Sequence, residues 1–155
     1  VEAIKKISGK SPSIRKKVNH YAVRLSSKPL AINLLKLGSY KSLEWQIPKD
    51  ILVDDEAKIE FLRAFYDSEG YVGPKMIAVQ SVNQGGLKEI QEMLMKFGIE
   101  SRRYRYKRKQ KSWNENFLLY ILKKESRRRF LNKIGFNHSD KQERLRRFAN
   151  VTESG

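Results

Sequence analysis

The chain has 155 residues, a length that fits one ordinary domain or two small ones that share an interface. Its 33 Lys and Arg residues outnumber its 17 Asp and Glu residues, and a net charge of +16 is typical of proteins that bind a polyanion such as nucleic acid. Cysteine is absent and only two histidines occur, which excludes disulfides, zinc fingers and Cys/His zinc sites, so any metal needs oxygen ligands.

The first 38 residues are predicted to form a short run of helix, hairpin and helix. Apolar and polar residues alternate in the hairpin, and glycines end both helices. Residues 39–50 show no strong period and contain a proline, so we interpret them as a linker. In chain order, the expected elements are the last turns of a helix at 1–7, hairpin strands at 13–17 and 21–26, and a helix from Pro29 to Gly38.

A second series of elements begins at Asp54, where three acidic residues precede an apolar stretch. Acidic side chains cap free amides and oppose the positive end of the helix dipole, so they mark a helix start. That helix is apolar or small on two sides, which indicates that it is buried, and Gly70 ends it. The expected elements after it are a strand at 76–82, a helix at 87–97, strands at 101–111 and 117–123, and a helix at 126–134.

The two series share an internal order that indicates a repeat. Residues 9–38 and 98–135 both run from a glycine through a basic strand, a hairpin and an apolar helix to a closing glycine. Glycine after a helix is common, so the glycines alone carry little weight. Three matched elements in the same order make a repeat the better account.

The segment from Phe61 to Gly70 closes this helix with the sequence Asp-Ser-Glu-Gly. It resembles the LAGLIDADG motif, with Leu62 to Gly70 on the motif's nine positions. The acidic start before it, the paired strands after it and the basic hairpin that follows have the order of that family's αββαββα unit. The resemblance implies an α+β fold, the LAGLIDADG endonuclease fold, whose antiparallel sheet forms a DNA-binding saddle.

This resemblance implies a division of the chain and a missing partner. A cut through both strands needs two acids, so we expect a second LAGLIDADG unit, either an upstream part of a two-unit enzyme or a second copy of this chain. Our interpretation favours the upstream part. The implied divisions are the C-terminal part of a first unit at 1–38, a linker at 39–50, a complete unit at 51–138 and a basic C-terminal tail at 139–155.

Glu69 matches the last acid of the motif, which in this family holds the catalytic divalent ion. A carboxylate at a helix end can bind Mg²⁺ or a similar hard cation and help to activate water against a phosphodiester, although without the flanking pattern a solvated acid would be the simpler reading. Asp67 is expected to form structural hydrogen bonds. Phe61, Ala64 and Ser68 are expected at the interface with a second motif helix, because small residues four apart allow close approach.

The basic strand supplies the main candidates for DNA contact. Alternate residues project to one side of a strand, and a wholly cationic side suits the major groove better than a core, although a solvated charged strand is the alternative. The cations on that side are Arg103, Arg105, Lys107, Lys109 and Lys111. Tyr104 and Tyr106 are then expected on the helix side. Parity places Gln80 on the groove-facing side. Lys123 ends the last strand, near where family members carry a basic residue that stabilises the charged transition state, so the resemblance implies a catalytic role for it.

The expected function is site-specific hydrolysis of double-stranded DNA by a homing endonuclease encoded in an intron or an intein. Two alternatives stay open: a non-catalytic DNA- or RNA-binding protein of the same fold, such as an RNA maturase or a regulator, and a basic RNA-binding module in which the motif is a coincidence. Composition alone is also compatible with a ribosomal-type protein or a binder of anionic membranes. The charge can also serve only to keep a protein in solution. No apolar run is long enough to span a membrane and no signal peptide is visible, so we expect no membrane partner and an intracellular location, cytoplasmic or at the nucleoid if prokaryotic.

Overall fold

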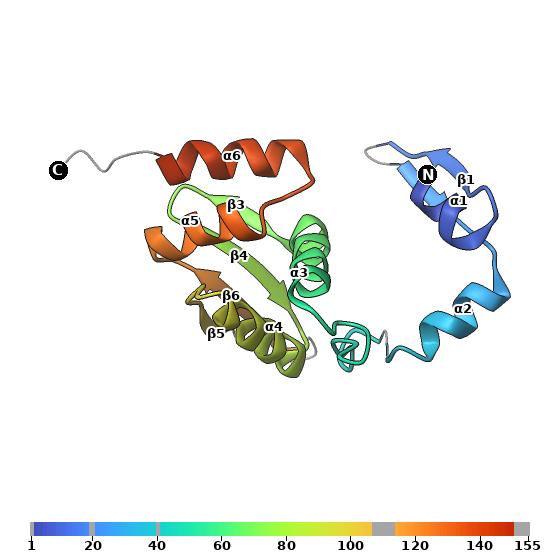
Figure 1. Ribbon diagram of the computed structural model, residues 1–155, viewed down its shortest axis with the longest axis horizontal. Helices are drawn as coiled ribbons and strands as arrows, with labels where there is room; N and C mark the ends of the chain where they lie inside the picture. The colour runs from blue at the N-terminus through green and yellow to red at the C-terminus, as the bar shows by residue number, and fades with distance from the viewer. Residues whose placement is uncertain (1, 19–20, 40, 107–113, 151–155) are drawn as a thin grey trace. The chain divides into compact units, whose positions relative to one another are not determined.

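The computed structural model describes residues 2–18, 21–39, 41–106 and 114–150. The chain divides into two compact units, Val1–Gly38 and Ser39–Gly155, and each is described by itself (Figure 1). Within the described residues, no helix combines the length and the apolar composition that a bilayer crossing requires.

The first unit contains the predicted hairpin between two helices. Ser27 caps the second helix, because its Oγ accepts a hydrogen bond from the Leu30 amide at 3.5 Å. The second helix buries none of its side chains, and Ile14 and Val23 of the hairpin are also exposed. Its elements are α1 (Glu2–Ser8), the antiparallel strands β1 (Ser13–Lys16) and β2 (Tyr21–Arg24), and α2 (Lys28–Leu35).

As far as residue 135, the second unit has the predicted order of helices and strands around one antiparallel sheet, which confirms the expected fold class; a further helix follows at 139–150. The strand order across the sheet is β3-β4-β6-β5. In chain order its elements are α3 (Asp55–Glu69), β3 (Tyr71–Gly73), β4 (Met76–Ser81), α4 (Gln84–Lys96), β5 (Arg102–Tyr106), β6 (Asn116–Ile121), α5 (Lys124–Lys133) and α6 (Ser139–Asn150).

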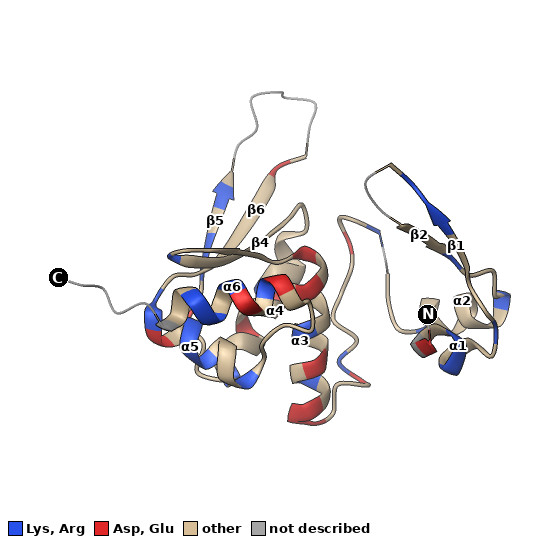
Figure 2. Cartoon of the chain, turned by 90° about the horizontal axis from the view of Figure 1, so that it is seen from above, with Lys and Arg blue, Asp and Glu red and all other residues tan. Residues whose placement is uncertain are grey.

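One face of the sheet packs against the helices, and no helix among the described residues of this unit lies on the other face (Figure 2). Figure 2 shows α3 to α6 on one side of the strands. The side chains of Ile77 and Val79 in β4 are buried, as are Leu119 and Ile121 in β6, and they share one core with Leu62 and Tyr66 of α3, Leu87, Ile90 and Leu94 of α4, and Phe130 of α5. Burial of each such side chain stabilises the fold by about 1.5–3 kcal/mol. The core therefore fixes which face stays open.

Trp45 and Ile47 pack on this core, which the interpretation of residues 39–50 as a linker did not anticipate. Ile47 is 5% exposed, and its amide donates a hydrogen bond to Glu89 Oε2 at 3.1 Å. The Asn83 side chain donates to the Trp45 carbonyl at 2.6 Å. Burial alone would raise the pKa of the Glu89 carboxyl, but hydrogen bonds from Lys49 and the Ile47 amide lower it below its ordinary value. The segment is thus anchored to α4 by its backbone and by a charged pair.

The C-terminal segment is also more ordered than a basic tail. Residues 139–150 form α6, whose Leu145 and Ala149 are buried while its Arg residues face outward. Apolar residues four apart form one face of a helix, and here that face covers the core beside β3 and α5. Residues 139–150 of the predicted tail are therefore part of the folded unit.

A pair of neighbouring glycines in α4 tests how Trp45 docks on this helix. A Cβ at Gly86 would lie 2.3 Å from the Trp45 ring, whereas a Cβ at Gly85 would make only an ordinary 3.5 Å contact. We expect Gly86→Ala to lower the free energy of unfolding by about 1–3 kcal/mol, because overpacking outweighs the gain in helix propensity. Urea unfolding measures it. Gly85→Ala is the control and should be neutral or slightly stabilising, and equal effects of the two would contradict the docking.

Candidate functional site

Glu69 is the last residue of α3, the helix that carries the motif and is called the motif helix below, and its side chain is exposed. The helix starts where the sequence predicts, because Asp54 Oδ1 accepts a hydrogen bond from the Ala57 amide at 2.7 Å. At its other end, Glu69 lines an open groove together with Ser68, Gln80 and other residues at the ends of β4 and β6. The acid that the sequence singles out therefore lies at the rim of the sheet.

The C-terminal end of α3 is held from two sides. Asp67 accepts hydrogen bonds from the backbone amides of Asn137 at 3.2 Å and His138 at 3.1 Å, which is the structural role expected for it. Lys141 Nζ donates to the Asp67 carbonyl at 2.7 Å and to the Tyr66 carbonyl at 3.2 Å, so a cation meets the negative end of the helix dipole. Lys141 escapes sequence reasoning because it lies more than 70 residues from its partners.

Gly70 ends α3 at a position where its backbone lies close to the Tyr66 carbonyl. Its amide donates to the Tyr66 carbonyl at 2.9 Å, and a Cβ in its place would lie 2.4 Å from that same oxygen. A side chain here would push the backbone away from the helix end. Glycine at this position therefore fixes how the chain turns from Glu69 into β3.

The oxygen donors around Glu69 suit a hard divalent cation. A carboxylate, the Ser68 hydroxyl and the Gln80 amide are the kinds of ligand that Mg²⁺, Mn²⁺ and Ca²⁺ accept. The described residues contain no group of three or more His, Cys, Asp or Glu that could hold a metal. Glu69 thus fits as one ligand of an ion whose further ligands come from a second acid, from water or from a bound phosphate.

The register of the strands decides which side chains lie on the open face. Tyr71 pairs with Ala78, Ala78 with Tyr120, and Tyr120 with Arg102. Cross-strand partners lie on the same face of a sheet. The open face carries Tyr71, Met76, Ala78, Gln80, Leu118, Tyr120, Arg102, Tyr104 and Tyr106.

Gln80 lies where parity places it, on the open face and beside Glu69. Its exposed amide can reach a ligand that lies over the sheet, since it lines both hollows that Glu69 lines. Contact with a base stays a prediction.

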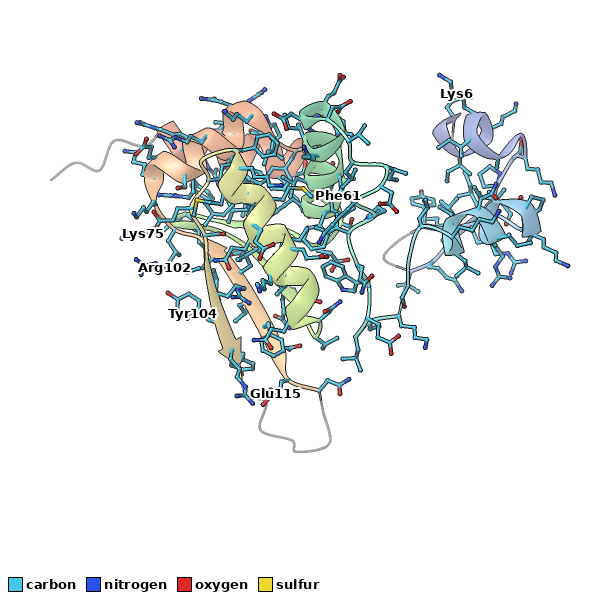
Figure 3. The ribbon with its side chains drawn as sticks, turned by 60° about the horizontal axis from the view of Figure 1, so that its bottom comes forward. Lys6, Phe61, Lys75, Arg102, Tyr104 and Glu115 are labelled. Carbon is cyan, nitrogen blue, oxygen red and sulfur yellow. The ribbon has the colours of Figure 1, made fainter. Side chains whose placement is uncertain are left out.

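The placement predicted for Arg103 and Arg105 is wrong. They pair with Leu119 and Phe117, whose side chains face the helices, and Arg103 Nε donates to Gln91 Oε1 of α4 at 2.7 Å. Arg105 forms an ion pair with Glu115, which raises the pKa of its guanidinium. Figure 3 shows Arg102 and Tyr104 on the side of β5 away from α4.

The physical reason for this error is the position of β5 at the edge of the sheet. All five of its residues are exposed, so its helix-facing side is no core and tolerates cations. Tyr104 and Tyr106 accordingly lie on the open face and not on the helix side. Lys107, Lys109 and Lys111 lie outside the described residues.

The structure does not bring Lys123 to Glu69. Lys123 precedes α5 and its Nζ forms an ion pair with Glu100 Oε2 at 2.5 Å, which lowers the pKa of the Glu100 carboxyl. It follows the end of β6 that pairs with Ile77, near the start of β4, whereas Glu69 lies with Gln80 near the end of β4. A shared site for Lys123 and Glu69 within this unit is therefore not supported.

The remaining predicted residues lie on the motif helix. Ala64 and Ser68 are exposed, and Ser68 Oγ donates to the Ala64 carbonyl at 2.8 Å. Phe61 and Phe65 are half-buried beside them. The helix thus presents a stripe of small residues flanked by aromatic rings that no other element of this unit covers completely.

Comparisons with protein families and with solved structures agree on the fold. The family model described as "LAGLIDADG-like domain" matches residues 56–135, more than half of the chain. A structure of mesophilic variants of the homing endonuclease I-DmoI is similar with a TM-score of 0.65 and 19% identity, over 87% of this chain and 64% of that one. I-DmoI in complex with DNA and Mn gives a TM-score of 0.63 and 19% identity, over 84% and 67%.

Three curated proteins of Methanocaldococcus jannaschii are also similar. A glutamine–fructose-6-phosphate aminotransferase is 34% identical over 63% of this chain, an uncharacterized protein 31% over 83%, and a protein named as translation initiation factor IF-2 28% over 85%. The chain spans 9%, 48% and 12% of their respective lengths. The names of the two longer proteins therefore refer to whole proteins of which the shared segment is a small part.

Proposed function

The chain belongs to the LAGLIDADG family, and on that premise we propose that it is part of a homing endonuclease that hydrolyses double-stranded DNA at a specific site with a divalent metal. The observation that carries this proposal is the position of Glu69. Its side chain is exposed at the end of α3, among oxygen donors and at the edge of an open sheet face. A net charge of +16 favours a DNA partner over that face.

The residues around Glu69 have separable tasks in this mechanism. Glu69 would hold one side of a divalent ion, which when bound polarises the scissile phosphate and acidifies a bound water. Asp67 and Lys141 fix the helix end and so orient the Glu69 carboxylate. Gln80 lies within the same groove, where it can orient the phosphate or a base. The related enzyme I-DmoI has been solved with DNA and Ca and with DNA and Mn, which supports divalent metal use.

A second motif helix is the other requirement of this proposal. Each strand needs its own acid, and the exposed stripe at Ala64 and Ser68 is suited to receive a second helix. Residues 1–38 support a two-unit arrangement, because they repeat part of the order of the second unit while leaving Ile14, Val23 and the side chains of α2 unburied. We propose that they belong to the first unit of such an enzyme.

An intein is the genetic context that the relatives favour. Similar segments make up 9% of an aminotransferase and 12% of an initiation factor, two proteins with unrelated names. A segment inserted in frame explains its presence in both, whereas an intron-encoded protein is read separately from its host. The reading frame around this chain tests the point, since a frame without host-protein sequence on either side would contradict it.

Cleavage of a plasmid library tests the proposed activity. We expect the protein, combined with a second LAGLIDADG unit, to convert plasmids that carry its site from supercoiled to linear form in Mg²⁺ or Mn²⁺ and to leave them intact in EDTA. Agarose gels and sequencing of the cut ends give the readout. Tight binding without cleavage in every metal would contradict nuclease activity and favour the non-catalytic alternative, and preference for structured RNA in a gel shift would favour an RNA-binding role.

A further inference from the structure

The open face of the sheet is rich in half-exposed tyrosines. Tyr71 is 51% exposed, Tyr104 45% and Tyr106 56%, and Tyr120 lies between the first two across the sheet. Aromatic rings normally contribute to a fold by being buried. Three such rings exposed on one face of a folded sheet indicate a surface that meets a ligand.

The rings are arranged on an apolar floor with cations beside them. Tyr104 and Tyr120 meet edge to face, with centroids 5.5 Å apart and an interplanar angle of 66°. The Arg144 guanidinium of α6 lies 5.5 Å from the centroid of Tyr71. Arg102 lies on the same face, beside Tyr104 along β5, and Figure 3 shows both side chains pointing away from α4. The floor between the rings is formed by Met76, Ala78 and Leu118.

This chemistry differs from that of a face built only to read a duplex. Readout of base pairs relies on Arg, Lys, Asn and Gln, whose hydrogen bonds match the base edges in the groove. On the described strands, Arg102 and Gln80 are the exposed residues of this kind on the open face. A duplex keeps its bases stacked on each other, so it offers tyrosine rings only edges and methyl groups. Unpaired bases offer their π-faces.

We propose that the open face binds unpaired bases of a single nucleic-acid strand, which stack on Tyr104, Tyr106 and Tyr71 while Arg102 and Arg144 contact the phosphates. A four-stranded antiparallel sheet with exposed rings and neighbouring cations is the arrangement that single-strand platforms use. The charge of +16 suits a polyanionic strand and opposes a second copy of the chain as the occupant. The inference goes beyond cleavage, because it concerns the same face as the proposed duplex site but does not depend on Glu69.

Fluorescence anisotropy with labelled 20-nucleotide oligo-dT and oligo-rU tests the proposal on the full chain. Tyr104→Ala and, independently, Tyr106→Ala should each weaken single-strand binding roughly 5- to 100-fold, as expected for loss of one stacked base. Tyr104→Phe retains the ring and should stay within about twofold of wild type. Because stacking releases no counterions, the slope of log affinity against log salt should not change in the tyrosine variants. Circular dichroism confirms that each variant folds.

The arginines of β5 provide a matched control for the face itself. Arg102 and Arg103 are neighbours on opposite faces. Arg102→Ala should lower the salt slope by about one, the value for one lost phosphate contact, whereas Arg103→Ala should leave affinity and slope unchanged. Equal effects of both would show that only overall charge matters and would overturn the proposal.

A strand without bases shows whether the face binds the bases or only the phosphates. Wild type should bind an abasic 20-mer no better than Tyr104→Ala binds oligo-dT. Equal binding of abasic and normal strands overturns the proposal, as does a Tyr104→Ala variant that loses self-association in sedimentation but keeps its single-strand affinity. A tighter complex with dT or with rU supports it and identifies the source of the bases as DNA or RNA. If the protein cleaves duplex DNA but does not bind single strands, this inference is wrong and the proposed nuclease activity stands. If it binds single strands but does not cleave, only the proposed nuclease activity is wrong.

Discussion

Replacing Glu69 with glutamine is expected to abolish metal-dependent DNA cleavage while leaving DNA affinity nearly unchanged. Glutamine keeps the shape of the side chain but loses the negative charge that a divalent ion needs. A bound metal stabilises the charge of the transition state by several kcal/mol. Without it, the cleavage rate should fall roughly a hundredfold to ten-thousandfold. Plasmid linearisation in Mg²⁺ gives the rate, and a gel shift in Ca²⁺ gives the affinity.

The matched control for this change is Glu56→Gln, an identical substitution at another exposed position of the same helix. It should leave cleavage intact, because Glu56 lies in the first turn of α3, far from the groove that Glu69 lines. Both side chains are exposed, so neither variant should change the unfolding transition much. Cleavage at the wild-type rate by Glu69→Gln would show that the metal is held elsewhere.

Local signals in the sequence were enough to predict the order of helices and strands as far as residue 135, but not α6. Asp54 caps α3 as its acidic neighbours indicate, and glycines with positive φ follow α1, α4 and α5 at Gly9, Gly98 and Gly135. These signals act within a few residues of chain. The motif at the end of α3 is equally local, which is why Glu69 could be identified before its surroundings were known.

Contacts between distant residues could not be predicted in the same way. Trp45 docks against Gly86, and Lys141 caps the end of α3, yet neither sequence neighbourhood contains a signal for its partner. Residues 45–49 show no periodicity because they dock through the Trp45 ring, the Ile47 amide and the Lys49 ion pair and not through a regular face. Absence of a pattern therefore did not indicate absence of structure.

The orientation of β5 illustrates a different limit. The period of two correctly separates Arg103 and Arg105 from Tyr104 and Tyr106, but it does not say which set faces the helices. Pairing with β6 decides this, because Leu119 and Phe117 face the core side. A central strand would have buried the tyrosines. At the edge of the sheet both sets are exposed, and burial no longer discriminates between them.

The second large effect is expected at Ala64, where tryptophan should abolish double-strand cleavage. Ala64 and Ser68 are exposed and small, so a second helix can pack with its axis about 8–10 Å away. An indole ring at this position would push the helices apart and separate Glu69 from the second acid. A misplacement of about 1 Å can cost roughly a hundredfold in rate, so the loss should be at least of that order.

Lys88→Trp, the same substitution at an exposed position of α4, is the control and should leave cleavage unchanged. Unfolding of the isolated chain should be nearly unaffected in both variants, since neither side chain is buried in it. Sedimentation and the dependence of the rate on protein concentration then identify the partner helix. A rate that rises with the square of concentration and is lost in Ala64→Trp indicates a second copy, whereas rescue by an upstream unit at a fixed ratio indicates a two-unit enzyme. Efficient double-strand cutting by Ala64→Trp would contradict pairing through this face.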